Sequence, residues 1–127
     1  MSGRSYRSNK TSILAVDNAV MFLNSLERYL EDAPYDLHCV TSGREALQFL
    51  DDNQPNLILL DIEMPEMDGY ELARRIKQSG QKAPIVFITA NSEQEDVDKA
   101  IKAGAAGVLI KPFRTNQLLD KIKECIR

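Results

Sequence analysis

The chain has 127 residues and a formal net charge of −3, with 43% hydrophobic and 28% charged residues. These values predict one globular domain, exclude a disordered chain and give no reason to expect a nucleic-acid-binding surface. No apolar run approaches the ~20 residues needed to cross a bilayer, and the polar start lacks the apolar core of a secretory signal. Cys39 and Cys125 are too few for a disulfide framework, so we expect a cytoplasmic protein with reduced thiols and no membrane contact.

Residues 1–11 are polar and basic and precede the first apolar run. Arg4, Arg7 and Lys10 are the charged residues of this stretch, and no acid accompanies them. We therefore predict an N-terminal tail over 1–11 and one folded domain over 12–127. The tail is either a solvated chain end or a short arm that contacts an acidic partner.

After this tail, short apolar runs alternate with segments whose apolar residues recur at steps of three and four. The runs, which are typical of strands, lie at 12–16, 37–40, 57–60, 85–88 and 108–110. Helical periodicity follows each run, with apolar positions spread over 19–30, 46–50, 70–76, 97–101 and 118–126.

Polar residues mark the starts of several predicted helices. Ser42 with Glu45, and Ser92 with Glu95, match the S-x-x-E capping box, and Asp68 is expected to cap the third helix. Five strand–helix units predict an α/β fold, a five-stranded parallel doubly wound sheet with five helices, because a closed barrel needs more units.

The informative polar residues stand where the predicted strands end. Asp17, Asp61, Thr89 and Lys111 each directly follow an apolar run. In an open parallel sheet, ligands bind in the crevice beyond the carboxyl ends of the strands, so we expect these four side chains to surround one crevice. Taken singly, each also has a plain interpretation as a cap, a turn residue or a solvated charge.

Together, the four side chains suit the transfer of a phosphoryl group to a carboxylate. Paired carboxylates bind Mg²⁺ through oxygen, and a carboxylate can be the nucleophile that forms an acyl phosphate. Lys111 would supply positive charge, and Thr89 a hydrogen-bond donor, to the phosphoryl oxygens. Asp61 is the predicted nucleophile because it follows the most hydrophobic run, which indicates the most central strand.

The segment Leu59–Gly69, LLDIEMPEMDG, resembles the phosphoacceptor segment of bacterial response-regulator receiver domains, the chemotaxis-regulator-like family. Ile88–Ala90, Gly104–Gly107 and Lys111–Phe113 resemble the later motifs of this family, in its order and at its spacing. The resemblance extends over about residues 12–126. It implies a flavodoxin-like sheet with the strand order 2-1-3-4-5.

The resemblance also implies a function in two-component signalling. Asp61 would accept a phosphoryl group from a sensor histidine kinase, a phosphotransfer protein or a small donor, and Thr89 and Lys111 would bind its oxygens. Such a chain is not an enzyme beyond catalysing its own phosphorylation and dephosphorylation. The implied cofactor is Mg²⁺, held by Asp17, Asn18, Asp61 and the backbone carbonyl of Glu63. A cis peptide bond is expected between Lys111 and Pro112.

Two residues depart from the usual pattern of the family. Asn18 stands where a second acid is expected, which removes one formal charge and predicts weaker Mg²⁺ binding and slower phosphorylation. Alternatively, Asn18 is a plain N-cap of the first helix. Val108 replaces an aromatic residue that often turns inward on phosphorylation, so the switch must use other parts of the face formed by helix 93–103, strand 108–110 and the last helix. We expect the output protein to bind there.

Two other functions stay open at this point. A pseudo-receiver would bind partners without taking phosphate, which Asn18 and Val108 favour and the retained strand-end residues disfavour. A flavodoxin-like binder of flavin or nucleotide is disfavoured because Asp17 and the three residues after it replace a Gly-rich phosphate loop. His38 belongs to the second predicted strand, away from the crevice, and is expected to be structural. With no output domain expected after the last helix, the chain is either a stand-alone protein or part of a longer regulator.

Overall fold

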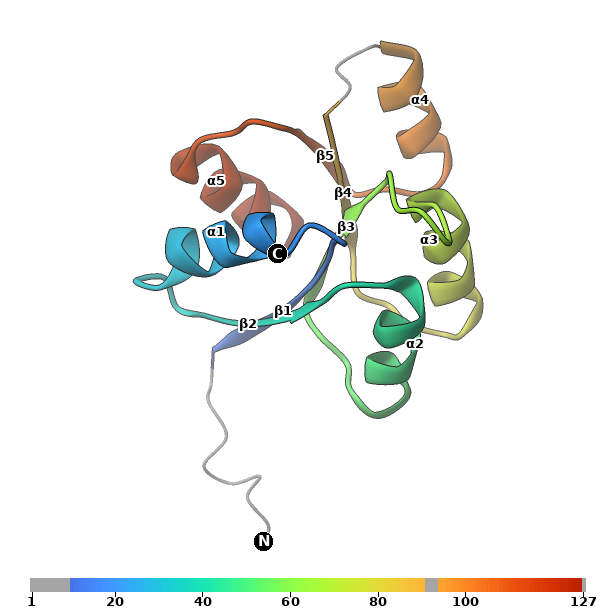
Figure 1. The fold of residues 1–127 in the computed structure, drawn as a ribbon, viewed down its shortest axis with the longest axis horizontal. Helices are drawn as coiled ribbons and strands as arrows, with labels where there is room; N and C mark the ends of the chain where they lie inside the picture. Colours follow the sequence, from blue (N-terminus) through green and yellow to red (C-terminus); the bar gives the residue numbers. More distant parts are fainter. Residues whose placement is uncertain (1–9, 91–93, 127) are drawn as a thin grey trace, which may run out of the picture.

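The computed structural model describes residues 10–90 and 94–126, so the predicted capping box at Ser92 and nearly all of the predicted tail lie outside the described residues. Within them, five strands alternate with five helices (Figure 1). The strands are β1 Thr11–Val16, β2 Tyr35–Val40, β3 Leu57–Asp61, β4 Ile85–Thr89 and β5 Gly107–Ile110. The helices are α1 Val20–Leu30, α2 Gly43–Asp52, α3 Gly69–Gln78, α4 Gln94–Lys102 and α5 Thr115–Ile126.

The strands form one parallel sheet in the order β2-β1-β3-β4-β5, which confirms the predicted doubly wound fold and its strand order. All residues of β3 and β4 are buried, as expected for strands covered on both faces, whereas β2 alternates between half-buried and exposed residues at one edge. Val16 pairs with Leu60, and Asp61 with Ile88. The carboxyl ends of β1, β3 and β4 therefore lie level with one another.

Helices cover the sheet on both faces. In Figure 1, α1 and α5 lie on one side of the sheet, and α2, α3 and α4 lie on the other. Successive strand residues point to opposite faces, so the two cores share no residue: one includes Leu26, Leu59 and Leu118, and the other Leu60 and Leu72. Each such fully buried side chain contributes about 1.5–3 kcal/mol to stability. In the described part of the chain, no helix is both long and apolar enough to span a membrane.

The described helix starts show how far the capping predictions hold. Asp68 caps α3, because its carboxylate accepts a hydrogen bond from the Glu71 backbone N–H at 2.8 Å. Ser42 caps α2 and accepts from the Glu45 N–H at 3.1 Å. The Glu45 carboxylate accepts hydrogen bonds from the N–H and the hydroxyl of Thr41, at 2.7 and 2.8 Å. In a standard capping box the donor would be the N–H of the N-cap residue, which is the residue after Thr41. Both caps are confirmed, with this one change of partner.

The edge strand β2 is longer than its apolar pattern predicted. It begins at Tyr35 rather than Leu37, because all six of its residues pair with β1, from Tyr35 opposite Thr11 to Val40 opposite Val16. Alternate positions such as Asp36 are exposed, as expected for an edge strand with one face toward solvent. Backbone pairing with β1, rather than a continuous apolar run, therefore defines the start of β2.

Candidate functional site

The predicted strand-end residues meet at the carboxyl edge of the sheet. Asp61 and Thr89 are the last residues of β3 and β4, and Asp17 and Lys111 directly follow β1 and β5. Asp17 is 1% exposed, Asp61 5% and Thr89 3%, although all three are polar. The backbone N–H of Lys111 donates to the Thr89 carbonyl at 2.8 Å, which fixes the start of the β5–α5 connection beside β4.

Asp17 joins two parts of this site through its two carboxylate oxygens. Oδ1 accepts a hydrogen bond from the Ala19 backbone N–H at 2.8 Å, which fixes the turn between β1 and α1. Oδ2 lies 3.0 Å from the Lys111 ammonium nitrogen and forms an ion pair with it, although the two residues are 94 positions apart in the sequence. The carboxylate is almost fully buried, so its pairing with a cation offsets its desolvation.

The surroundings of Asp61 favour the protonated form of its carboxyl group over the ionised form. Burial, and next the negative charge of Asp17, raise the pKa of Asp61 from its ordinary value to about 6. Two interactions act the other way: the Glu63 N–H donates to Asp61 Oδ1 at 3.1 Å, and Lys111 contributes its positive charge. An added cation at this position would relieve the repulsion between the two carboxylates.

Gly69 allows α3 to begin directly against Asp61. Its N–H donates to the Ile62 carbonyl at 2.7 Å. A Cβ atom at this position would lie 2.6 Å from both the Asp61 carbonyl oxygen and Ile62 Cα, closer than real Cβ atoms approach backbone. Only glycine fits this approach of two backbone segments. The sequence motif contained Gly69, but its spacing alone gave no sign of this contact.

Asn18 is exposed in the β1–α1 turn and does not cap the helix. The N-cap of α1 is Ala19, which makes no side-chain capping bond, so the alternative interpretation of Asn18 as a plain N-cap is wrong. The reason is that the Asp17 carboxylate accepts a hydrogen bond from the Ala19 N–H. The helix therefore begins one residue later than an N-cap at Asn18 would require. The Asn18 amide is thereby left at the solvent side of the cluster.

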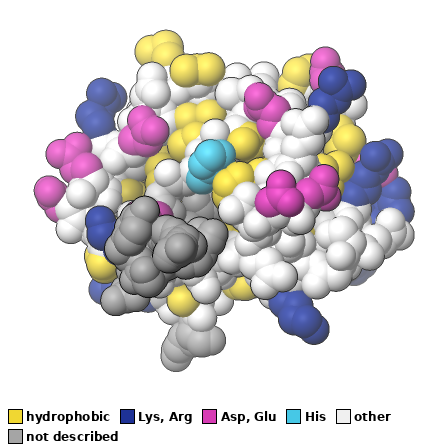
Figure 2. Space-filling model, turned by 90° about the horizontal axis from the view of Figure 1, so that it is seen from below, with side chains coloured by type: hydrophobic (Ala, Val, Ile, Leu, Met, Phe, Trp, Pro, Cys, Tyr) yellow, Lys and Arg dark blue, Asp and Glu magenta, His cyan; other side chains and the backbone are white. Residues whose placement is uncertain are grey.

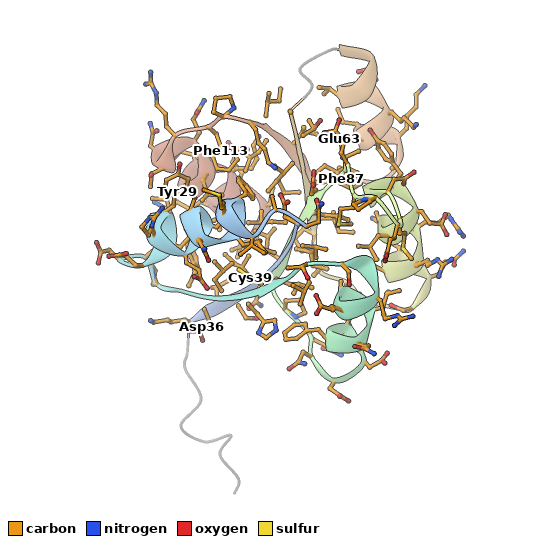
Figure 3. All side chains as sticks on the ribbon, viewed as in Figure 1. Tyr29, Asp36, Cys39, Glu63, Phe87 and Phe113 are labelled. Atoms are coloured by element: carbon orange, nitrogen blue, oxygen red, sulfur yellow. The ribbon has the colours of Figure 1, made fainter. Side chains whose placement is uncertain are left out.

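Oxygen atoms dominate the possible metal ligands here. In the residues that the structure describes, no group of three or more His, Cys, Asp or Glu side chains is placed to hold a metal ion. Asp17 and Asp61 are the buried carboxylates, and Glu63 lies exposed just after β3 (Figure 3). Any cation at this site would therefore take its remaining ligands from amide, carbonyl or water oxygens, a donor set typical of Mg²⁺.

One contact at the site was not predicted from the sequence. The Lys111 ammonium nitrogen lies 4.0 Å from the centroid of the Phe22 ring, within the range of a cation–π interaction. Phe22 belongs to α1, where its spacing indicated only a core position. The available signal was weak: an aromatic residue in the first turn of α1, five residues after Asp17.

Other predicted features lie as expected or away from the cluster. The peptide bond between Lys111 and Pro112 is cis. His38 stacks on Phe49, with ring centroids 4.3 Å apart, and Figure 2 shows this histidine at the surface among hydrophobic side chains. It contacts an aromatic ring of α2 rather than a strand-end residue, which supports a structural role.

Comparison with known families gives a match over nearly the whole chain. The model of the response regulator receiver domain family matches residues 13–123. The Response regulator MprA of Mycolicibacterium vanbaalenii is 33% identical over 115 residues, covering 91% of this chain and 50% of that protein. The Response regulator protein TodT of Pseudomonas putida F1 is 31% identical over 129 residues, covering 99% of this chain and 56% of that protein. The chain thus spans about half the length of these relatives.

Solved structures give the same result for the fold. The chemotaxis protein CheY4 of Vibrio cholerae is similar with a TM-score of 0.86 and 29% identity, over 91% of this chain and 98% of that one. The receiver domain of the sensor histidine kinase PA1611 of Pseudomonas aeruginosa is similar with a TM-score of 0.81 and 28% identity, over 92% of this chain and 98% of that one. That structure has a magnesium ion coordinated in its active-site cleft.

Proposed function

The chain belongs to the response regulator receiver domain family, and from this premise we propose that Asp61 is the phosphoacceptor of a two-component signalling system. One observation carries the proposal: buried Asp61, with its pKa raised to about 6, lies at the carboxyl edge with Asp17 and Lys111. We propose further that residues 12–127 form the receiver domain, as predicted, that Thr11 belongs to it because β1 begins there, and that the residues before Thr11 form a tail. The family match leaves the flavin- or nucleotide-binding alternative without support.

The proposed reaction transfers a phosphoryl group from a phosphohistidine of a kinase or phosphotransfer protein. An ionised oxygen of Asp61 attacks phosphorus, and the new P–O bond forms as the P–N bond to the donor imidazole breaks, leaving the electron pair on nitrogen. Lys111 and Thr89 would contact the phosphoryl oxygens and stabilise their charge. Attack of water on phosphorus later releases phosphate and restores Asp61, so the chain catalyses only its own phosphorylation and dephosphorylation.

The oxygen-rich site fits Mg²⁺, the proposed cofactor. Two buried carboxylates that repel each other are suitable ligands for a small dication. The proposed ligands are Asp17, Asn18, Asp61 and the backbone carbonyl of Glu63. Bound Mg²⁺ would neutralise negative charge on the transferred group. The magnesium ion in the similar Pseudomonas aeruginosa receiver domain supports this assignment.

The proposed output surface is formed by α4, β5 and α5, where phosphorylation would change the binding of a partner protein. Val108 in β5 is half-buried and packs against the core that contains Phe87. It has no ring that could turn inward, so any switch at this surface has to act through the backbone of β4 and β5 or through other side chains.

The direct test is the intact mass of the protein after incubation with Mg²⁺ and acetyl phosphate. We expect one added phosphoryl group, absent from the Asp61→Asn variant and from a sample containing EDTA. Early sampling excludes loss by rapid hydrolysis. If no group is added at any time, the proposed phosphoacceptor role is wrong, and the chain is then an interaction module that binds partners without phosphate.

A further inference from the structure

We infer that Phe22 is a positioning residue for Lys111, and that its ring holds the ammonium group at the phosphorylation site. This inference rests on the proposed role of Asp61 and Lys111 in phosphoryl transfer. Phe22 itself is not expected to touch the phosphoryl group, so it acts through the lysine.

The Lys111 ammonium group has two different neighbours. Its nitrogen lies 3.0 Å from Asp17 Oδ2 and 4.0 Å from the Phe22 ring centroid. The lysine side chain is 25% exposed, so the contact is partly shielded from water, where a cation–π interaction is stronger than at an open surface. Asp17 and Phe22 therefore both restrict where the end of this long side chain can lie.

Both neighbours come from one short segment of the chain. Asp17 accepts a hydrogen bond from the Ala19 N–H at 2.8 Å, and the Phe22 N–H donates to the Ala19 carbonyl at 3.0 Å. The β1–α1 turn thus fixes the carboxylate and the ring relative to each other. Lys111 comes from a segment near the other end of the chain. Asp17 and Phe22 therefore form a binding position for its ammonium group that does not depend on the lysine itself.

The Phe22 ring is itself supported by other aromatic side chains. It meets the Phe113 ring edge to face, with centroids 5.9 Å apart, and Tyr29 meets Phe113 at 6.3 Å. Figure 3 shows Tyr29 and Phe113 between α1 and the segment that leads into α5. Such edge-to-face pairs favour a defined ring orientation, which keeps the face of Phe22 toward the ammonium group.

A ring offers an advantage over a further carboxylate at this position. It attracts the ammonium group without adding a negative charge that would repel an incoming phosphoryl group. Lysine is a flexible side chain, and a group already held near its working position loses less freedom when the phosphoryl group arrives. Removing the ring should therefore slow phosphorylation even when Asp61 and Asp17 are intact.

A competing role for Phe22 is contact with a phosphodonor protein, because the neighbouring Val20 and Met21 are 57% and 82% exposed. The two roles differ in one respect. A docking residue matters only when the donor is a protein, whereas a positioning residue also matters when the donor is a small molecule. Acetyl phosphate therefore separates them.

The test compares wild type with Phe22→Leu, Phe22→Tyr and Phe49→Leu. Phe49 is a half-buried ring that stacks on His38, so its variant controls for the loss of a ring elsewhere. Two quantities are measured: the rate of phosphorylation by acetyl phosphate at saturating Mg²⁺, and the NMR shift of the Lys111 protons next to the ammonium group. Protons over an aromatic face are shifted upfield, so this shift reports the contact itself.

We expect Phe22→Leu to lose the upfield shift and to slow phosphorylation about fivefold, which corresponds to an ordinary cation–π contact. Phe22→Tyr should restore both, and Phe49→Leu should change neither. Phe22→Met replaces the leucine variant if the latter does not fold. The inference is wrong if the shift survives in Phe22→Leu, if the rate with acetyl phosphate is unchanged, or if tyrosine does not rescue it. If wild type accepts no phosphoryl group, the proposed function fails, and the Lys111 shift alone decides whether Phe22 positions the lysine.

Discussion

Asn18 is a neutral residue next to the two buried acids of the site, so it adds no negative charge there. It lies between Asp17 and the first turn of α1, is exposed, and makes no helix cap. The buried carboxylates of the cluster are then those of Asp17 and Asp61, and Asp17 is already paired with Lys111. A site with this charge should hold a dication less tightly than a site with three acids.

Substitution of Asn18 by Asp is therefore expected to tighten Mg²⁺ binding, roughly tenfold, because it adds a carboxylate at the edge of the proposed dication site. Calorimetric titration of the purified protein with MgCl₂ measures the change. Asn24→Asp adds the same charge at an exposed position of α1 and serves as the control. Equal affinity in the Asn18 and Asn24 variants would show that general charge, rather than ligation, governs binding.

The raised pKa of Asp61 predicts a pH-dependent stability of the metal-free protein. With a pKa of about 6, folded Asp61 keeps its proton at pH values where the unfolded chain has released it. Stability from this residue is therefore present below the unfolded pKa, near 4, and is lost as pH rises through about 6. Asp61→Asn has no proton to lose and should be more stable than wild type at pH 7 by about 1–3 kcal/mol.

Urea unfolding of both proteins in EDTA, at several pH values between 4 and 7, checks this expectation. The difference between Asp61→Asn and wild type should be largest at pH 7 and shrink toward pH 4. Hydrogen bonds from Thr41 lower the pKa of Glu45, and hydrogen bonds from Arg75 and Arg74 lower the pKa of Glu71. These effects are the same in both proteins and cancel in the difference. A difference that does not vary with pH would mean that packing, and not ionisation, separates the two.

At the scale of elements, features set by neighbouring residues could be predicted from the sequence. Asp68 and Ser42 cap their helices because a cap acts on backbone groups only a few residues away. The buried strands β3 and β4 could be identified because burial on both faces leaves only apolar side chains in the run. The start of β2 at Tyr35 was missed because pairing with β1 extends an edge strand beyond its apolar residues.

Contacts between distant elements could not be predicted in the same way. The strand order was inferred from a family resemblance, since periodicity does not say which strands pair. The approach of Gly69 to the Asp61 backbone, and the position of Phe22 against Lys111, both depend on how helices pack on the finished sheet. Sequence patterns placed the strand-end residues at one edge but gave no partner for the lysine.

A contact chain from β4 to α4 suggests how the fold could transmit phosphorylation without an aromatic residue at position 108. Phe87 lies two residues before Thr89 and on the same face of β4. The Tyr70 ring meets Phe87 at 5.3 Å, and the Lys99 ammonium of α4 lies 4.6 Å from the Tyr70 centroid. These contacts connect the face of β4 that carries Thr89 to Lys99 of α4.

We expect beryllofluoride with Mg²⁺, a mimic of the phosphoryl group, to shift the backbone amide signals of Lys99 and its neighbours in α4 and of Val108 in β5. Comparison of two-dimensional NMR spectra with and without the mimic measures this. Asp61→Asn, treated identically, should show no such shifts. If the mimic binds near Asp61 and the signals of α4 and β5 stay unchanged, no switch operates at this surface.

On the scale of the whole molecule, the two apolar cores on the faces of the sheet stabilise the fold. The buried carboxylates at the carboxyl edge of the sheet destabilise it. Among the described residues, the buried polar or charged side chains are those of Asp17, Asp61 and Thr89, all at this edge. The repulsion between the two carboxylates is present in the folded state and relaxed in the unfolded chain. A ligand that cancels it should therefore stabilise the entire fold.

Mg²⁺ is expected to raise the free energy of unfolding of the whole domain. At a concentration ten times its dissociation constant, an ion that binds only the folded state adds about 1.4 kcal/mol, or about 5 °C in Tm for a domain of this size. Thermal unfolding followed by circular dichroism, with MgCl₂ or EDTA, measures the shift. NaCl at matched ionic strength separates binding from general screening.

Asp61→Asn should lose most of the gain, because it removes both a ligand and the repulsion that the ion relieves. An equal gain in wild type and Asp61→Asn would place the ion elsewhere on the protein.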